Sequence, residues 1–178
     1  LIVQVSRFDV FKDPLGVIEA FKLVRSQTPC RLVLVGAPAT DDPEGAEVLH
    51  HVLERAEGDK DIHVVQLDPL DKTSVNALQR SATAVIQKST REGFGLTVTE
   101  ALWKKKPVIG GAAGGILVQI YNGFNGYVVH SIEGCAYWTR FLLAREDLRT
   151  QLGENGHAFV RREFLITRHL IDWLMLIK

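Results

Sequence analysis

Two glutamates stand on either side of a glycine-rich turn in the middle of the sequence. Glu92 directly precedes Gly93-Phe94-Gly95, and Glu100 follows in the helical pattern after the turn. Carboxylates accept hydrogen bonds from paired hydroxyl groups, such as those of a sugar. The two glycines allow backbone conformations that other residues avoid, and they let a ligand approach the main chain. This stretch is therefore the first place where the sequence predicts ligand binding.

The helix predicted after the turn adds a site for negative charge. Main-chain N–H groups of Gly95, Leu96 and Thr97 would point outward from the helix N-terminus, where they can bind a diphosphate. Glu92 and Glu100 could then face one ligand from two sides, with Glu92 contacting a hexose and Glu100 a ribose. Short motifs also match by chance. Without a ligand, Glu92 would be a loop charge and Glu100 a stabilising residue of the first helical turns.

Two cations follow the first apolar run of the sequence. Arg7 and Lys12 lie in "SRFDVFKDP", residues 6–14. Together they could clamp a diphosphate and stabilise its negative charge as it leaves a substrate. Taken alone, two such loop cations are typical of a solvated surface.

Strand-like apolar runs alternate with helical patterns along the chain, and these elements must position the candidate residues. The predicted strands are residues 1–6, 30–36, 61–67, 82–89, 106–111 and 125–130. The predicted helices are residues 13–27, 43–58, 72–81, 95–105, 132–145, 146–161 and 163–177.

This alternation predicts an α/β fold, a doubly wound, Rossmann-like parallel sheet of about six strands covered by helices on both faces. One domain over residues 1–178 is the simplest organisation. Ligands of such sheets bind outside the carboxyl ends of the strands. We therefore expect residues 6–14 and 89–96 to lie at one edge of the sheet.

The composition argues against several classes of function. Lys plus Arg and Asp plus Glu number 21 each, so the net charge is 21 − 21 = 0, and no bulk attraction to nucleic acid or to a membrane surface results. Cys30 and Cys135 form neither a disulfide framework nor a metal motif, which favours a reducing, cytoplasmic setting. Asp41 and Asp42 are more typical of a turn or helix cap than of a metal site. No apolar run is long enough to cross a bilayer, and the start at Leu1 predicts a domain cut from a longer protein.

A nicotinamide-dependent dehydrogenase is disfavoured by the loop after the first strand. Such enzymes carry Gly-x-Gly-x-x-Gly at this position, with an acidic residue about twenty positions further on. Residues 6–14 lack those glycines.

Together these motifs resemble the C-terminal, nucleotide-sugar-binding domain of retaining glycosyltransferases built from two Rossmann-like domains (the GT-B type). The resemblance is carried by Arg7 and Lys12, by residues 92–96 with Glu100 and Ala101, by residues 106–109, by "GGI" at 114–116 and by "NGFNGYVV" at 122–129.

Finer features resemble the trehalose-forming members and their trehalose phosphorylase relatives. They lie in residues 41–45, 75–110 and 114–120. Lys88-Ser89 stands where the broad family has proline-serine, and Val118 stands where an acidic residue is frequent. Trehalose synthases resemble this chain at both places.

The resemblance implies a nucleoside-diphosphate glucose donor and a role for each site residue. Arg7 and Lys12 would hold the diphosphate, and the Leu96 and Thr97 amides would bind phosphate. Glu92 and residues 93–95, including Phe94, would meet the glucose.

The remaining implied contacts are to the nucleoside. Glu100 would bind the ribose, and Gln66 and Leu67 would lie near the base. The implied catalytic residues are Glu92, Arg7 and Lys12, and no metal or other cofactor is required.

The implied reaction transfers glucose to a glucose acceptor with retained α configuration and gives trehalose. The acceptor would bind on an N-terminal domain that this chain lacks, so the chain would bind nucleotide sugar without completing transfer. Two alternatives stay open: a trehalose phosphorylase that uses phosphate in place of nucleotide, and a non-catalytic nucleotide-binding module. A sugar epimerase is a remote third.

The last apolar helix bears on partners. Residues 164–177 predict an amphipathic helix, which could pack on the absent domain or cause self-association into a homodimer.

Overall fold

The computed structural model describes residues 1–37 and 43–177, and a six-stranded parallel sheet forms its centre. The strand order is β3-β2-β1-β4-β5-β6, and Val3 of β1 lies opposite Val33 of β2 and Val85 of β4. The strands are β1 (Ile2–Val5), β2 (Leu32–Gly36), β3 (Ile62–Gln66), β4 (Ala84–Gln87), β5 (Val108–Gly111) and β6 (Gly126–Val129). The predicted α/β, doubly wound parallel fold is confirmed.

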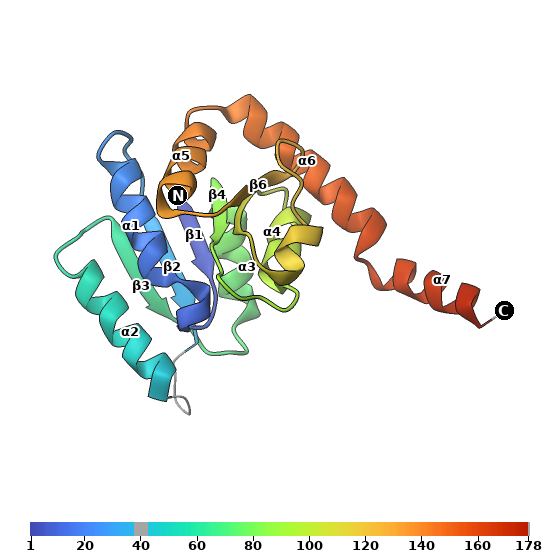
Figure 1. The fold of residues 1–178 in the computed structure, drawn as a ribbon, viewed down its shortest axis with the longest axis horizontal. Helices are drawn as coiled ribbons and strands as arrows, with labels where there is room; N and C mark the ends of the chain where they lie inside the picture. Colours follow the sequence, from blue (N-terminus) through green and yellow to red (C-terminus); the bar gives the residue numbers. More distant parts are fainter. Residues whose placement is uncertain (38–42, 178) are drawn as a thin grey trace.

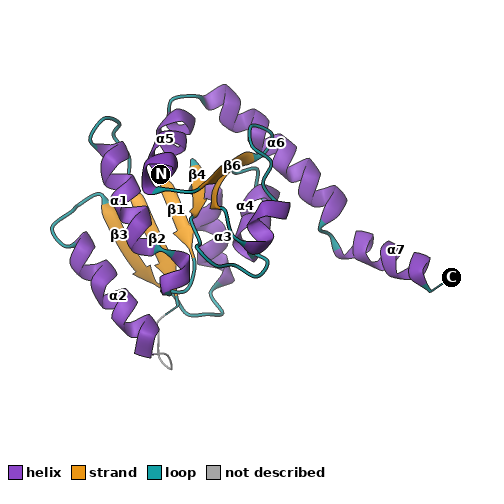
Figure 2. Cartoon of the chain, viewed as in Figure 1, coloured by secondary structure: helices purple, strands orange, loops and turns teal. Residues whose placement is uncertain are grey.

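Helices cover both faces of the sheet (Figure 2). The α-helices are α1 (Pro14–Arg25), α2 (Pro43–Ala56), α3 (Lys72–Ser81), α4 (Leu96–Trp103), α5 (Ile132–Leu143), α6 (Glu146–Glu163) and α7 (Ile166–Leu176). Successive strand residues point to opposite faces, so Ile2 packs under α1, α2 and α5, while Val3 packs under α3, α4 and α6.

The N-terminus of α4 lacks the side-chain cap that α1 and α5 have. Asp13 caps α1, because its carboxylate accepts a hydrogen bond of 3.0 Å from the N–H of Gly16. Ser131 caps α5 in the same way through the N–H of Gly134. Helix α4 begins instead after Gly95, which has a left-handed φ of 87° and supplies no side-chain cap. The N-terminus of α4 is therefore open to an outside acceptor.

Two short 3-10 helices were not predicted from the sequence. They are η1 (Val10–Lys12), after β1, and η2 (Gly114–Val118), after β5. Elements of three to five residues carry too little periodicity to be recognised in a sequence. Both lie at the carboxyl edge of the sheet, so they shape the candidate site.

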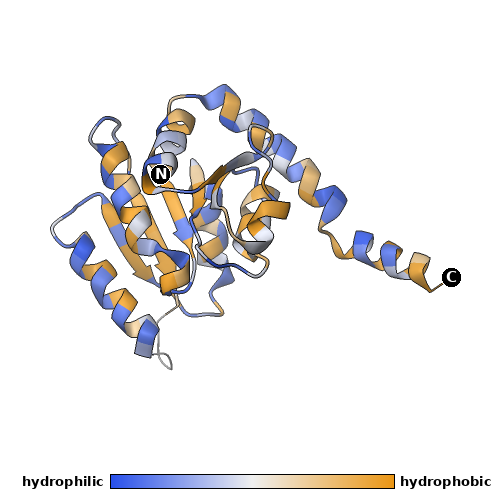
Figure 3. Ribbon diagram, in the orientation of Figure 1, coloured by the Kyte–Doolittle hydropathy of each residue, from blue (hydrophilic) through white to orange (hydrophobic). Residues whose placement is uncertain are grey.

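The chain ends in a helix that stands apart from the sheet. In Figure 1, α7 extends from the end of α6 away from the rest of the molecule. Its apolar side chains include Leu170, Trp173 and Leu174, each more than half exposed. Orange segments of the α7 ribbon in Figure 3 mark hydrophobic residues of this helix. Within residues 1–37 and 43–177, no helix combines the length and hydropathy needed to span a membrane.

Candidate functional site

An ion pair joins the two loops that the sequence singled out. Lys12 lies at the end of η1, after β1, and Glu92 follows β4. The Lys12 Nζ atom lies 2.7 Å from Glu92 Oε2, and the two side chains are only 18% and 11% exposed. Strands β1 and β4 are neighbours where the strand order reverses, which is where doubly wound sheets bind their ligands. Two predicted site residues thus meet at the predicted edge.

The loop that presents Lys12 is fixed by its main chain. The Gln4 side-chain amide donates to the carbonyl oxygen of Lys12 at 2.8 Å. The N–H of Thr90, in the loop after β4, donates to the carbonyl oxygen of Phe11, also at 2.8 Å. Lys12 is therefore held by both strands that border the site.

A second ion pair, between Lys88 and Asp13, fastens the same two loops. Asp13 is the cap of α1 and has a left-handed φ of 48°, which is uncommon for a residue with a side chain. The sequence marked Lys88 only as a departure from a family pattern. Its partner lies 75 positions away along the chain, and no local signal joins the two.

The glycine turn before α4 fits closely against the segment that begins with "GGI". The N–H of Gly115 donates to the carbonyl oxygen of Gly93 at 2.8 Å. A Cβ atom on Gly114 would lie 1.7 Å from the carbonyl oxygen of Glu92, and one on Gly115 would lie 2.5 Å from Cα of Phe94. These two positions leave no room for a side chain, so η2 fixes the shape of the turn.

Gln119 supports the turn from beneath, a role that no pattern in the sequence indicates. It is fully buried, and its side-chain N–H₂ donates to the carbonyl oxygens of Phe94 and Gly115. Its side-chain oxygen accepts a hydrogen bond from the hydroxyl of Thr99 on α4. A glutamine inside "GGILVQI" has no distinctive spacing, and only the fold brings it under the turn.

The first N–H groups of α4 are available for an anion. Leu96 is largely exposed, and the main-chain N–H groups of Leu96 and Thr97 have no acceptor among residues 1–37 and 43–177. Donors of this kind at a helix N-terminus favour negative charge.

Glu100 lies one turn further along α4, where its carboxylate accepts a hydrogen bond of 3.2 Å from the Gln79 side chain of α3. The Gln79 oxygen accepts in turn from Lys104. Burial lowers the pKa of Lys104, and the negative charge of Glu100 acts in the opposite direction. The structure records no contact between Glu100 and the Lys12–Glu92 pair within the described residues.

Three other predicted residues also lie outside the Lys12–Glu92 cluster. The Arg7 side chain is 73% exposed and pairs with Asp9 at 3.2 Å. Gln66 ends β3, the outer strand of the sheet, with an exposed side chain, and Leu67 is half-buried. Their roles toward a diphosphate and a base stay predictions.

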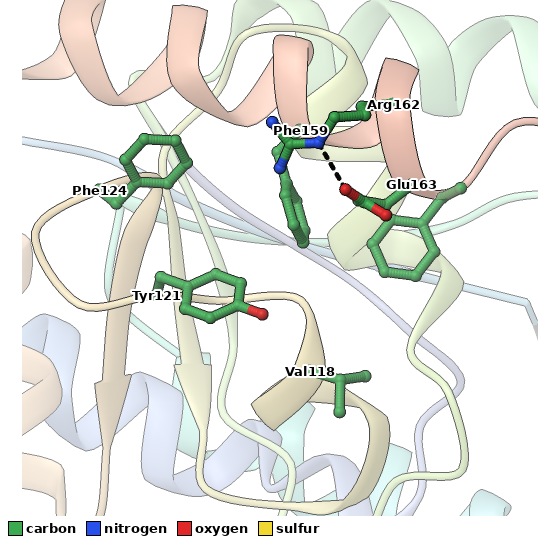
Figure 4. Close-up of a pocket in the computed structure, with 7 residues that line it drawn as sticks. Val118, Tyr121, Phe124, Phe159, Arg162 and Glu163 are labelled. Atoms are coloured by element: carbon green, nitrogen blue, oxygen red, sulfur yellow. Dashed lines mark hydrogen bonds and ion pairs between the residues drawn. The ribbon is translucent and has the colours of Figure 1, made fainter.

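A pocket lies elsewhere, between the segment after η2 and the end of α6 (Figure 4). It has a volume of about 690 Å³, and none of the predicted site residues lines it. A smaller pocket of about 140 Å³ opens at the carboxyl ends of β4, β5 and β6 and includes Lys88, Ser89 and His130. Neither of these two pockets is lined by Lys12 or Glu92.

Within the described part of the chain, no three His, Cys, Asp or Glu side chains lie together in a way that could hold a metal ion. Asp41 and Asp42, for which a turn or cap was predicted, lie outside the described residues.

The fold is a doubly wound, Rossmann-like α/β domain whose candidate site lies at the switch point of the sheet. The chain belongs to the family described as "Glycosyl transferases group 1", whose family model matches residues 1–159. The predicted relationship to glycosyltransferases is confirmed.

Two curated relatives bear on the subgroup. The chain is 44% identical to a trehalose synthase from Rubrobacter xylanophilus, over 98% of this chain and 42% of that protein. It is 32% identical to a trehalose phosphorylase from Grifola frondosa, over 98% of this chain and 26% of that protein. The chain therefore spans less than half the length of these relatives.

Solved structures confirm the fold. A glycosyltransferase from Rickettsia africae superposes with a TM-score of 0.85 at 22% identity, over 98% of this chain and 46% of that one. The C-terminal domain of the group 1 protein LpcC from Francisella tularensis gives 0.79 at 26% identity, over 93% of this chain and 86% of that one. Anabaena Alr3699/HepE in complex with UDP-glucose gives 0.81 at 19% identity, over 99% of this chain and 49% of that one.

Proposed function

We propose that this chain is the nucleotide-sugar-binding domain of a retaining glucosyltransferase that makes trehalose from a nucleoside-diphosphate glucose and glucose. The observation that carries the proposal is the Lys12–Glu92 ion pair at the switch point of the sheet, beside the open N-terminus of α4. A cation, a carboxylate and unpaired N–H groups are what a sugar diphosphate requires.

The diphosphate would lie between the loop after β1 and the start of α4. Lys12 and Arg7 would bind its oxygens, and the N–H groups of Leu96 and Thr97 would donate hydrogen bonds to its remaining oxygens. Arg7 is free to move toward such a ligand, since its side chain is 73% exposed and pairs only with the nearby Asp9 within the described residues.

The glucose would lie against Glu92 and the main chain of residues 93–95. Because η2 and Gln119 fix that main chain, the contacts to the sugar would be formed in advance. Glu100 would bind the ribose, and Gln66 and Leu67 would lie near the base.

In the proposed reaction, the bond between glucose C1 and the diphosphate oxygen breaks. A new bond forms between C1 and a hydroxyl oxygen of the acceptor glucose, on the same face. The hydroxyl proton passes to the leaving phosphate oxygen. Lys12 and Arg7 would stabilise the charge on that leaving group, so no metal is needed.

A second domain is part of the proposal. The chain covers 42% of the Rubrobacter trehalose synthase, and LpcC provides a C-terminal domain that the chain matches over most of its length. An acceptor site on the remainder would complete the site beside Lys12 and Glu92. We expect the chain alone to bind the donor without transferring glucose.

The comparisons support this function over its alternatives. Anabaena Alr3699/HepE has been solved with UDP-glucose, and the trehalose synthases are more similar to this chain than the phosphorylase is. A phosphorylase would use the same cations for inorganic phosphate, and a non-catalytic module would bind nucleotide alone. The free thiols Cys30 and Cys135 fit the cytoplasmic setting that we propose.

Calorimetric titration of the purified chain with UDP, ADP, UDP-glucose, ADP-glucose and inorganic phosphate tests the proposal. We expect one nucleoside diphosphate to bind and Lys12→Ala to weaken it about 10-fold or more, because a charged hydrogen bond is lost. Lys22→Ala, on the surface of α1 and paired only with Glu19 and a carbonyl among the described residues, is the matched control and should leave binding unchanged. Binding of phosphate alone would favour the phosphorylase, and a folded chain that binds nothing would refute the proposal.

A further inference from the structure

A chain of hydrogen bonds through two buried side chains runs from the start of α4 to the Glu92 carboxylate. The Thr97 hydroxyl lies 3.0 Å from the Gln87 side-chain oxygen, and the Gln87 side-chain nitrogen lies 3.1 Å from Ser89 Oγ. Ser89 Oγ lies 3.2 Å from Glu92 Oε2. Gln87 and Ser89 are only 1% and 2% exposed, so the bond between them is shielded from water, and the two outer bonds are partly buried.

Chemistry fixes the direction of every bond in this chain. A carboxylate only accepts, so the Ser89 hydroxyl must donate to Glu92. Ser89 then accepts from the Gln87 N–H₂ group, which leaves the Gln87 oxygen to accept from the Thr97 hydroxyl. Bonds that point the same way polarise one another, so the chain strengthens the final contact to the carboxylate.

The two oxygens of Glu92 end in different states. Oε2 accepts from both Lys12 Nζ, at 2.7 Å, and Ser89 Oγ, at 3.2 Å. Oε1 has no hydrogen-bond partner in the part of the chain that the structure describes. One oxygen is thus anchored, and the other is left to accept from a ligand hydroxyl.

We infer that Ser89, held by Gln87, is a positioning residue that fixes the Glu92 carboxylate for the sugar and links it to the N-terminus of α4. This inference rests on the proposed function, because the sugar is the ligand that Oε1 would meet. Lys12 alone cannot fix the carboxylate, since its ammonium would also bind the diphosphate. The Ser89 hydroxyl stays on Glu92 when Lys12 turns to the phosphates.

The inference predicts different effects on the affinity for the nucleoside diphosphate and on the affinity for the nucleotide glucose. If Ser89 only stabilised the fold, its loss would change both affinities together. Loss of the Ser89 hydroxyl should weaken the contact to the sugar and spare the contacts to the diphosphate. The measured quantity is the ratio of the dissociation constant of the nucleoside diphosphate to that of the corresponding nucleotide glucose.

The test is calorimetry on Ser89→Ala with the nucleotide pair that the wild-type chain binds. We expect this ratio to fall about 5- to 10-fold, while the dissociation constant of the nucleoside diphosphate changes less than about twofold. Thr139→Val is the matched control, since it removes an equally buried hydroxyl, which donates to the carbonyl of Cys135 on α5. The control should leave the ratio unchanged.

A second variant keeps the inference testable if Ser89→Ala does not fold. Thr97→Val keeps the shape of a partly buried side chain and removes only the first bond of the chain. The ratio should fall about 2- to 3-fold, because one bond of a polarised chain is lost.

An unchanged ratio in folded variants would overturn the inference, and so would a ratio near one for the wild-type chain. In either case, a wild-type chain that still binds the nucleoside diphosphate would leave the proposed function standing. A wild-type chain that binds no nucleoside diphosphate would instead refute the proposed function.

Discussion

The turn between β4 and α4 and the terminal helix α7 are opposite cases within one chain. In residues 87–95, the polar side chains that become buried find partners inside the chain, as Gln87 and Ser89 do. In α7 (Ile166–Leu176), the apolar side chains face outward, and no residue of the helix is buried. The contacts that define the turn come from the chain itself, whereas nothing in the described residues covers the apolar side of α7.

This contrast predicts that substitutions in the turn destabilise the chain more than substitutions in α7 do. The turn between β4 and α4 packs against loops that are distant in sequence. A substitution there would therefore displace several neighbouring residues. Helix α7 has few neighbours to displace. Its apolar side chains form an exposed hydrophobic patch, and patches of this kind are typical of interfaces.

The largest effect on stability is expected from Gly114→Ala, because Gly114 packs directly against the turn. A Cβ atom would lie 1.7 Å from the carbonyl oxygen of Glu92, and the residue has a left-handed φ of 43°. Overpacking and backbone strain together should lower the free energy of unfolding by about 3 kcal/mol, measured by urea denaturation.

Gly123→Ala is the matched control for that substitution. Gly123 also has a left-handed φ, of 74°, but a Cβ atom there would meet nothing within 4 Å. Only the backbone term applies, so we expect a loss of about 1 kcal/mol. Equal losses at the two glycines would mean that η2 does not constrain the turn.

A smaller effect is expected from Lys88→Met, which removes the ion pair that fastens the cap of α1 to the loop after β4. The Lys88 and Asp13 side chains are 11% and 25% exposed, so the loss is intermediate between a buried and a surface pair. We expect the free energy of unfolding to fall by about 1–2 kcal/mol.

Lys105→Met provides the comparison, because Lys105 pairs with Glu154 while both side chains are more than half exposed. A change within about 0.5 kcal/mol is expected there. Similar values for the two lysines in urea denaturation would contradict the structural role assigned to Lys88.

The reactivity of the two cysteine thiols tests the stability of the folded chain without any substitution. Burial raises the pKa of Cys135, on α5, to about 12, and it also raises the pKa of the half-buried Cys30. Since only the thiolate reacts, Cys135 should be silent toward a disulfide reagent at pH 8 until the chain unfolds. Cys30 should react slowly in the native state. Rapid reaction of both thiols would show that α5 opens readily.

The smallest effect on stability is expected from Leu174→Glu in α7. Leu174 is 58% exposed, so the free energy of unfolding should change by less than about 0.5 kcal/mol. Any concentration-dependent association, followed by sedimentation, should decrease. A loss above about 1 kcal/mol would instead mean that α7 packs on the body of the molecule.

Much of the fold followed from short-range patterns. The apolar runs that contain β1 and β4 and the helical spacing of residues 13–27 predicted the parallel sheet, and the glycines at 93 and 95 predicted the start of α4. These signals are local, because strand and helix periodicities are set by neighbouring residues.

The details of the site did not follow in the same way. The sequence placed Lys12 and Glu92 at one edge, but it did not show that they form an ion pair. It gave no indication of Gln119 under the turn or of the Lys88–Asp13 pair. Elements as short as η1 and η2 also escaped recognition, because they span about one turn each.

By itself, the sequence determined which residues form strands and helices and which side chains are candidates to bind phosphate and sugar. Only the tertiary structure decided that Glu92 has one anchored oxygen and one without a partner among the described residues, and that Gln87 and Ser89 hold the carboxylate there. The physical reason is distance along the chain. Periodicity is a property of adjacent residues, whereas a hydrogen bond between distant residues exists only after the sheet has brought their loops to one edge.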